Sequence, residues 1–155
     1  MPEEIERKFL VKKEIWLKAA KPIPDFYRQG YLYSDVSKTI RIRVTNTTAF
    51  LTIKGRTIGF SRPEFEYEIP QKEGVEILNI MTENNLEKYR YNIYFEGKLW
   101  EVDEFKGENE GLLLAEIELT SADETFTLPD WIGEEVTQDN RYYNAYLSRH
   151  PFLKW

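Results

Sequence analysis

The sequence predicts an α+β, mainly β fold, in which eight antiparallel strands close into a β-barrel, or tunnel, with a charged interior and a few peripheral helices. The first observation behind this prediction is that charged residues recur at every second position in stretch after stretch, with largely apolar residues between them. Successive side chains of a strand point to opposite faces, so each such strand has one ionic and one apolar face. The second observation is that charges of one sign occur in blocks, as in Arg41-Ile42-Arg43.

Eight segments alternate in this way or are rich in aromatic and β-branched residues, and turn residues separate them. The predicted strands are residues 3–11, 25–33, 39–46, 49–55, 60–69, 86–95, 98–105 and 112–119. Asn46-Thr47-Thr48 and Glu96-Gly97 are short enough to be hairpin turns, so the strands on either side of each are expected to pair antiparallel.

Four segments between or after these strands are predicted to be helical, at residues 12–20, 73–84, 121–125 and 140–148. Pro22 and Pro24 end the first of them, and Asp139 is positioned to cap the last. The aromatic residues of the helices and loops are expected to pack between the helices and the barrel; they are Trp16, Trp131, Tyr142, Tyr143 and Tyr146.

The bulk composition limits the classes of function. The 155 residues are expected to form one domain, residues 1–155, and the net charge of −6 disfavours a nucleic-acid partner. The absence of cysteine excludes disulfides and thiolate metal sites. The N-terminus lacks the pattern of a signal peptide and no apolar run is long enough to span a membrane, so a cytoplasmic location without a membrane partner is expected. A homodimer is left open.

The ionic face of the sheet is the feature that points to function. For any one strand it could simply meet bulk solvent, but blocks of one sign usually serve a ligand of the other sign. A closed barrel of about eight strands would turn this face inward, and its interior is wide enough for one small ligand. So many ionised groups cannot be buried dry, because each costs several kcal/mol, so the interior is expected to be a water-filled tunnel.

Carboxylates clustered without cysteine, in a chain with a single histidine, favour the hard divalent cations Mg²⁺ or Mn²⁺. Arginines and lysines favour a polyanion, and the planar guanidinium suits phosphate. A site that combines both is typical of phosphoryl transfer.

An ordered set of motifs resembles the CYTH proteins, also called triphosphate tunnel metalloenzymes, over essentially the whole chain. The motifs are Glu4-Ile5-Glu6-Arg7-Lys8, Arg28-Gln29-Gly30-Tyr31-Leu32, Arg41-x-Arg43, Leu51-Thr52-Ile53-Lys54, Arg62-x-Glu64-x-Glu66, Glu87-Lys88-Tyr89-Arg90, Asp103, Glu116-x-Glu118, Glu134-Glu135-Val136-Thr137 and Arg141-Tyr142. The resemblance implies an eight-stranded antiparallel tunnel that binds a triphosphate and one or two Mg²⁺ or Mn²⁺ ions. The chain looks most similar to the short bacterial members that hydrolyse inorganic tripolyphosphate.

The resemblance also implies roles for individual residues. Expected metal ligands are Glu4, Glu6, Asp103, Glu116 and Glu118, with salt bridges to the basic residues of the tunnel as the alternative. Expected to bind the phosphates are Lys8, Arg41, Arg43, Lys54, Arg62, Lys88, Arg90 and Arg141. Glu64 and Glu66 either orient these basic side chains or bind metal. Water activated by the cation is the simplest nucleophile. The candidate catalytic residues are Lys8 and Tyr31: Tyr31 is expected next to Lys8, whose charge would lower its pKa and make it a proton acceptor, with packing as the alternative role of Tyr31.

The predicted function is therefore divalent-metal-dependent hydrolysis of a triphosphate, with inorganic tripolyphosphate as the expected small-molecule substrate. The alternatives are cyclisation of ATP, as in class IV adenylyl cyclases, and hydrolysis of thiamine or nucleoside triphosphates. A polyphosphate- or nucleotide-binding module without turnover is the non-enzymatic alternative.

Overall fold

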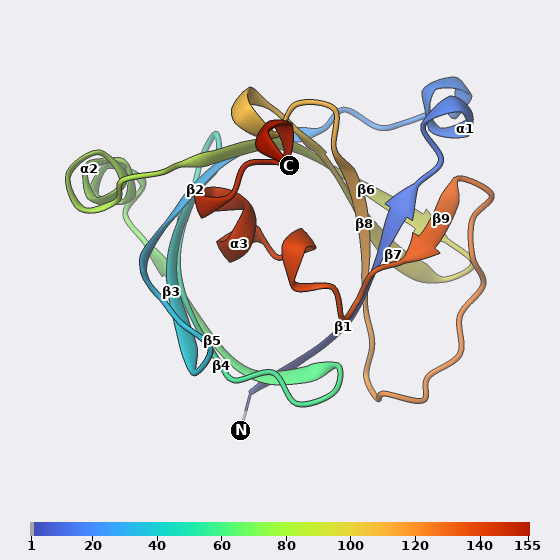
Figure 1. Ribbon diagram of the computed structural model, residues 1–155, viewed down its shortest axis with the longest axis horizontal. Coiled ribbons are helices and arrows are strands. Elements are labelled where there is room, and N and C mark those ends of the chain that lie inside the picture. The colour runs from blue at the N-terminus through green and yellow to red at the C-terminus, as the bar shows by residue number, and fades with distance from the viewer. Residues whose placement is uncertain (1) are drawn as a thin grey trace.

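In a computed structural model, which describes residues 2–155, nine strands of the described chain form one antiparallel sheet (Figure 1). The strands are β1 (Glu3–Val11), β2 (Asp25–Ser34), β3 (Lys38–Val44), β4 (Ala49–Gly55), β5 (Ser61–Ile69), β6 (Leu86–Phe95), β7 (Lys98–Phe105), β8 (Leu113–Glu118) and β9 (Ile132–Glu135). The helices are α1 (Lys13–Lys18), α2 (Gln71–Met81) and α3 (Asn144–Arg149), with 3₁₀ turns η1 (Gly107–Asn109), η2 (Asn140–Tyr142) and η3 (Phe152–Lys154).

Eight of these strands form a closed ring, which confirms the predicted architecture. The neighbours around the ring are β5, β4, β3, β2, β6, β7, β8 and β1, and β1 closes it by pairing with β5 again. Strand β1 pairs with both of its neighbours through different residues. Glu3–Ile5 pair with β5, and Glu6–Leu10 pair with β8. Because the ring is closed, each of these eight strands has a paired neighbour on both sides, and the ring has no edge strand.

The ninth strand, β9, was not predicted, because it has only four residues among turn-forming ones. It pairs with the outer end of β1, where a side chain at Gly133 would come within 3.2 Å of the Leu10 carbonyl oxygen. The predicted helix at residues 121–125 is wrong: this segment is a turn, in which Glu124 accepts hydrogen bonds from the Thr120 amide at 2.7 Å and from Lys98. Those acceptor bonds satisfy the local donors without a helix.

The predicted C-terminal helix is divided into η2 and α3. Asp139 does cap the start of this region, because its carboxylate accepts from the Arg141 amide. None of the helices among residues 2–155 has the length and apolar character needed to cross a membrane.

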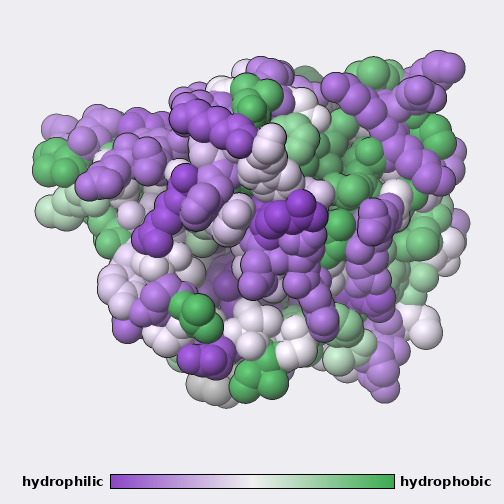
Figure 2. Space-filling model, in the orientation of Figure 1, coloured by the Kyte–Doolittle hydropathy of each residue, from purple (hydrophilic) through white to green (hydrophobic). Residues whose placement is uncertain are grey.

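The hydrophobic core lies outside the ring, between the apolar face of the sheet and the peripheral segments. On one side, Leu78 of α2 packs against Ile42, Val44 and Ala49. On the other, Trp16 of α1 packs against Trp131, which in turn packs against Trp100, as predicted for Trp16 and Trp131. In the view of Figure 2, hydrophilic residues cover the middle of the face, and apolar residues gather toward the region of β7 to β9. The ionic face therefore points into the ring.

The inner face changes character at one end of the ring. Strand alternation places Leu86, Phe105 and Leu114 on the same side as the charged residues that precede or follow them, yet these three are apolar and almost fully buried. They pack with Leu147 of α3 and with Val136. Figure 1 shows η2 and α3 lying within the outline of the ring. One end of the lumen is thus filled by an apolar cluster that the C-terminal segment completes.

Helix α2 approaches the ring so closely that only glycine fits at position 74. A β-carbon at Gly74 would lie 2.5 Å from that of Ala49. We predict that Gly74→Ala lowers the free energy of unfolding by about 1–3 kcal/mol, because the added methyl group overpacks this contact. Urea denaturation measures the loss, with Lys72→Ala on the exposed side of α2 as a control expected to change stability by less than about 0.5 kcal/mol. Equal stability of the two variants would contradict this description of the packing.

Candidate active site

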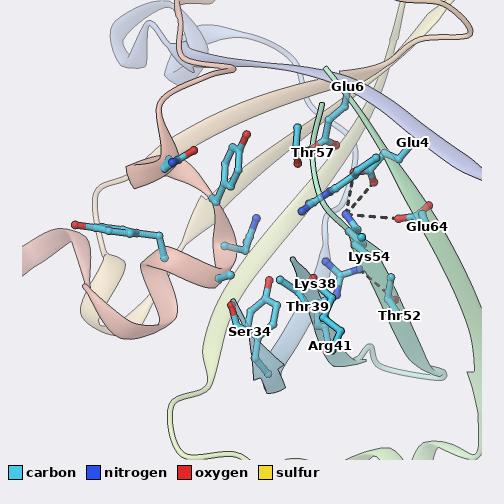
Figure 3. A pocket seen from close by; sticks show the side chains of 18 of the residues that line it. Glu4, Glu6, Ser34, Lys38, Thr39, Arg41, Thr52, Lys54, Thr57 and Glu64 are labelled. Atoms are coloured by element: carbon cyan, nitrogen blue, oxygen red, sulfur yellow. Dashed lines mark hydrogen bonds and ion pairs between the residues drawn. The ribbon is translucent and has the colours of Figure 1, made fainter. Parts of the chain in front are cut away.

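A cavity of about 660 Å³ lies inside the ring of strands (Figure 3). Most of the residues expected to bind substrate or metal line it: Glu4, Glu6, Lys8, Tyr31, Arg41, Arg43, Lys54, Arg62, Glu64, Glu66, Arg90, Glu116 and Glu118. They come from β1, β2, β3, β4, β5, β6 and β8, so residues far apart in the sequence share one enclosed volume. The ring therefore brings carboxylates and cations together as the alternation predicted.

Two arginines of β3 lie in the cavity with little counter-charge. Arg41 is 6% exposed, its Nε has no hydrogen-bond partner, and its closest carboxylate, Glu66, is 3.8 Å away. Arg43 donates from Nε to Gln29 at 3.1 Å, and no carboxylate of residues 2–155 lies within 4.0 Å of it. Burial, together with the charges of Arg41 and Arg90, lowers the pKa of Arg43 to about 10. These two side chains favour an anion between or beside them.

A second group of charges surrounds Glu4. Lys54 donates to both oxygens of this carboxylate, at 2.8 and 3.0 Å, and Arg62 donates to it at 3.3 Å. Burial alone would raise the pKa of Glu4, but Lys54 and Arg62 more than offset this and lower it. Burial and the charge of Glu4 raise the pKa of the neighbouring Glu64 to about 7. Figure 3 shows dashed lines from the Lys54 ammonium group to Glu4 and to Glu64, which are its two ion-pair partners at 2.8 and 3.5 Å. Lys54 and Arg62 are thus already paired with Glu4, and an incoming phosphate must compete with this carboxylate for them.

The third group is a pair of carboxylates, Glu6 and Glu116. Glu116 lies 3.5 Å from Lys8, and although burial opposes it, the charges of Lys8 and Arg90 lower its pKa. Burial, followed by the charges of Glu116 and Glu4, raises the pKa of Glu6 to about 8. Near neutral pH Glu6 therefore carries a proton that it donates to Glu116. Two carboxylates that share a proton are a suitable donor set for a hard divalent cation in its place.

The carboxylates do not form a ready-made metal centre. Among residues 2–155, no three histidine, cysteine, aspartate or glutamate side chains gather closely enough to hold an ion. Glu118 is exposed and lines the cavity near the Glu6–Glu116 pair, since β1 and β8 are neighbours and Glu6 is paired with Glu118 in register. A metal site at these residues would thus need side chains to rotate toward the ion.

Two of the expected site residues lie beneath the cavity. Asp103 accepts from Arg90 through both of its oxygens, at 2.8 and 2.9 Å, and from Lys88 at 2.7 Å. Burial would raise the pKa of Asp103, but the charges of Arg90 and Lys88 lower it to about 2. Neither Asp103 nor Lys88 lines the cavity, since both are next to the apolar end of the lumen. The contacts of Asp103 match the salt-bridge alternative, since it orients the two cations. Lys88 also donates at 3.1 Å to Asn144, which lines the cavity.

Arg141 also lies elsewhere than expected. It is exposed, pairs with Asp139 at 2.7 Å and lies over the rings of Tyr142 and Trp155. It is not among the residues that line the cavity. Its contacts in this structure are with the C-terminal segment.

Lys8 and Tyr31 both line the cavity, but within residues 2–155 no hydrogen bond joins them. Lys8 donates instead to the Tyr142 carbonyl at 2.9 Å. Tyr31 lies near Arg62, whose guanidinium would be stabilised by an ionised phenol at this position. A role for Tyr31 as proton acceptor would thus involve Arg62 rather than Lys8.

The C-terminal segment supplies cavity residues that sequence reasoning missed. Tyr143, Asn144 and Tyr146 line the cavity, although the tyrosines were expected to pack between helix and barrel. His150 stacks on Tyr146 at 4.2 Å between ring centroids. No periodicity marks these residues as lumen-facing, because the segment is not a strand. The motifs Glu134-Glu135-Val136-Thr137 and Arg141-Tyr142 were the sequence signals close to them.

The raised pKa of Glu6 makes stability depend on pH. A folded-state pKa of about 8 against an ordinary 4.5 means that the folded protein holds this proton more tightly than the unfolded chain does. The associated stability is complete below pH 4.5 and is lost as pH rises through about 8. In protein freed of metal by a chelator, Glu6→Gln should therefore make the decline of the unfolding free energy over this range shallower. Part of the decline remains because the pKa of Glu64 is also raised. Urea titrations across this range measure it, and an unchanged slope would contradict the assignment.

Comparisons with known proteins agree with the fold and with the motifs. The family model described as "CYTH domain" matches residues 2–145. An inorganic triphosphatase of Acetivibrio thermocellus is 50% identical over 153 residues, 98% of this chain and 97% of that protein. An inorganic triphosphatase of Nitrosomonas europaea is 40% identical over 154 residues, 94% of this chain and 96% of that protein.

Among solved structures, a crystal structure of an inorganic triphosphatase superposes with a TM-score of 0.66 at 35% identity, and covers 96% of this chain and 95% of that one. The family match spans nearly the whole chain, and it includes every strand of the closed ring. The chain belongs to the CYTH domain family.

Proposed function

We propose that this protein hydrolyses inorganic tripolyphosphate to pyrophosphate and phosphate, with Mg²⁺ or Mn²⁺ as the required cation. The observation that supports this most is the row formed by Arg41 and Arg43, buried or half-buried cations without close carboxylate partners inside a 660 Å³ cavity. A compact polyanion would supply the missing negative charge. Two relatives that match almost the whole chain are named inorganic triphosphatases, which supports the same substrate.

In this proposal the basic side chains bind and orient the phosphate chain. Arg41 and Arg43 receive one part of it, and Lys54 and Arg62 exchange some of their contact with Glu4 for contact with phosphate oxygens. Lys8, which lies 3.5 Å from Glu116, would neutralise charge that develops on the phosphoryl group under attack. Arg90 is held by Asp103 and therefore presents its charge in a fixed orientation.

The carboxylates of the cavity fit a divalent cation by their chemistry. Glu6 and Glu116, with Glu4 and Glu118 nearby, would hold it, since oxygen ligands without sulfur or imidazole suit Mg²⁺ and Mn²⁺. When bound there, such an ion would neutralise phosphate oxygens and favour the ionisation of water. Binding would displace the proton that Glu6 shares with Glu116, so the affinity for the ion should increase with pH.

The alternatives differ in what they require from the cavity. Cyclisation of ATP needs a pocket for a purine and a group that deprotonates the ribose, and no lining residue identifies either. Thiamine and nucleoside triphosphates share the phosphate chain, so they remain competing substrates. A binding module without turnover would gain nothing from the proton-sharing pair Glu6 and Glu116, whereas a cation-dependent enzyme would.

A panel of substrates tests the proposal. Phosphate release is measured from tripolyphosphate, ATP and thiamine triphosphate in Mg²⁺, in Mn²⁺ and in a chelator, with cyclic AMP measured in parallel. We expect release from tripolyphosphate to be fastest, to need a divalent cation and to yield one pyrophosphate for each phosphate. Cyclic AMP formation, or tight binding of tripolyphosphate without release, would contradict the proposal in favour of the corresponding alternative.

Arg41→Ala should lower kcat/KM for tripolyphosphate by about 10²-fold or more, the usual loss for one preorganised electrostatic donor. Arg28→Ala is the matched control. Arg28 does not line the cavity, because its guanidinium is held outside the ring by Asn85 and Asn79 at 2.7 and 2.8 Å. We expect the control to keep kcat/KM within about twofold, since surface changes away from a site are nearly neutral. Equal loss in both variants would remove Arg41 from the site.

Glu116→Gln tests the proposed cation site. The amide keeps the shape of the side chain but removes the charge, so the requirement for a divalent cation should no longer be met and turnover should cease. Circular dichroism checks that the fold persists. Turnover at the normal rate in Mg²⁺ would show that Glu116 does not hold the ion.

A further inference from the structure

We propose that Tyr143 is a positioning residue, whose aromatic ring fixes the two cations Lys8 and Arg62 for the phosphate chain. The inference rests on the proposed triphosphatase function, since it concerns two of the cations in that site. Tyr143 lies outside the ring of strands in the sequence, in the short turn between η2 and α3. It nevertheless lines the main cavity and a small adjacent one of about 20 Å³ beside Glu6.

Both cations lie over the same ring. The Lys8 ammonium is 5.2 Å from the centroid of Tyr143, and the guanidinium carbon of Arg62 is 5.9 Å from it. A cation within about 6 Å of an aromatic centroid is attracted by the negative face of the ring, by about 0.5–2 kcal/mol according to its exposure to solvent. One residue thus contacts a cation of β1 and a cation of β5, the two strands that close the ring of the sheet.

The two cations repel each other, and the charge of Arg62 is felt at Lys8. Lys8 is only 4% exposed and Arg62 is half-buried, so water screens this repulsion incompletely. Glu116 and Glu4 draw the pair in different directions, since Lys8 lies 3.5 Å from Glu116 and Arg62 lies 3.3 Å from Glu4. A shared aromatic face lowers the energy of the arrangement in which both remain near each other.

Residues on either side hold the ring in place. The carbonyl of Tyr142 accepts from Lys8 at 2.9 Å, and the Asn144 Oδ1 accepts from Lys88 at 3.1 Å and from Gln29 at 3.3 Å. One turn of α3 later, Leu147 is fully buried in the apolar cluster at the end of the lumen. The backbone of Tyr143 is therefore held between two anchored neighbours, which keeps its ring beside Lys8 and Arg62.

The hydroxyl group contributes little to this role. It donates to the Thr137 carbonyl at 3.4 Å, which is long for a hydrogen bond. The aromatic face is therefore the part that matters, and phenylalanine should replace tyrosine with little loss.

The kinetic test compares Tyr143→Phe and Tyr143→Leu with Tyr91→Leu. Tyr91 is a half-buried tyrosine on the outer face of β6, packed against Trp16, so its loss reports the effect of removing a ring without touching the lumen. We expect Tyr143→Phe to keep kcat/KM for tripolyphosphate within about threefold, and Tyr143→Leu to lose about tenfold or more, as the loss of cation–π contacts predicts. Tyr91→Leu should lower the Tm yet keep wild-type kinetics. A change in kcat/KM in Tyr143→Leu no larger than that measured in Tyr91→Leu at a comparable fall in Tm would overturn the proposal.

Fluorinated phenylalanines at position 143 separate electrostatics from packing in case Tyr143→Leu fails to fold. Successive fluorines keep the shape of the ring while they weaken its negative face. We expect kcat/KM to fall stepwise with the number of fluorines at constant Tm. A constant kcat/KM across this series would show that the ring only fills space.

A structural measurement keeps this inference separate from the proposed function. Crystal structures of the wild type, Tyr143→Phe and Tyr143→Leu show where Lys8 and Arg62 lie, whether or not the protein hydrolyses tripolyphosphate. We expect both side chains to keep their places in the first two and to move or lose order in the third. Unchanged positions in Tyr143→Leu would overturn the inference, and an inactive wild type with displaced cations in that variant would overturn only the proposed function.

Discussion

In a closed ring of strands every second side chain must point into the lumen, and the whole candidate site depends on that constraint. The chain fills those positions with charged residues along most of the ring and with apolar residues at one end. The charged side chains of the lumen are separated from the outer surface by the sheet, whose opposite face forms the hydrophobic core with α1 and α2. Confinement therefore converts an ordinary amphipathic pattern into a concentrated electrostatic site.

The charges inside the ring are only partly neutralised by one another. Asp103, Arg90 and Lys88 form a closely bonded group near the apolar end, and Glu4 holds Lys54 and Arg62. By contrast, Arg41 and Arg43 have little counter-charge, and Glu6 is paired with another carboxylate rather than with a cation. The cavity therefore has one region suited to an anion and one suited to a cation. A phosphate chain bound with a divalent ion would satisfy both regions at once.

Much of the fold could be predicted from the sequence, because period-two alternation directly reflects the geometry of a strand. The strands at residues 86–95 and 98–105 were predicted with their observed bounds, and the like-signed blocks correctly indicated which face points inward. The short strand β9 was missed because it forms only by pairing with β1, which is distant in the sequence. The turn at residues 121–125 was missed because the hydrogen bonds of the Glu124 side chain stabilise it, and these cannot be recognised from a local pattern.

The position of a side chain along the axis of the lumen also could not be predicted from the sequence. Lys88 and Arg41 belong to equally clear motifs, but only the stagger of the strands and the packing of Leu147 place Lys88 beneath the cavity. Tyr143 could not be recognised for a related reason: it enters the lumen from a non-strand segment, so no alternation identifies its side chain as inward-facing. Family resemblance named Arg141 in the same segment, which lies outside the cavity.

A crystal structure of the protein with Mn²⁺ and a non-hydrolysable imido analogue of tripolyphosphate would show directly whether the lumen binds both ions. We expect electron density for the phosphate chain inside the ring, against Arg41, Arg43 and Lys54, with anomalous scattering from manganese near Glu6 and Glu116. A phosphate chain bound outside the ring, or a lumen free of it at saturating concentration, would show that the lumen is not the binding site.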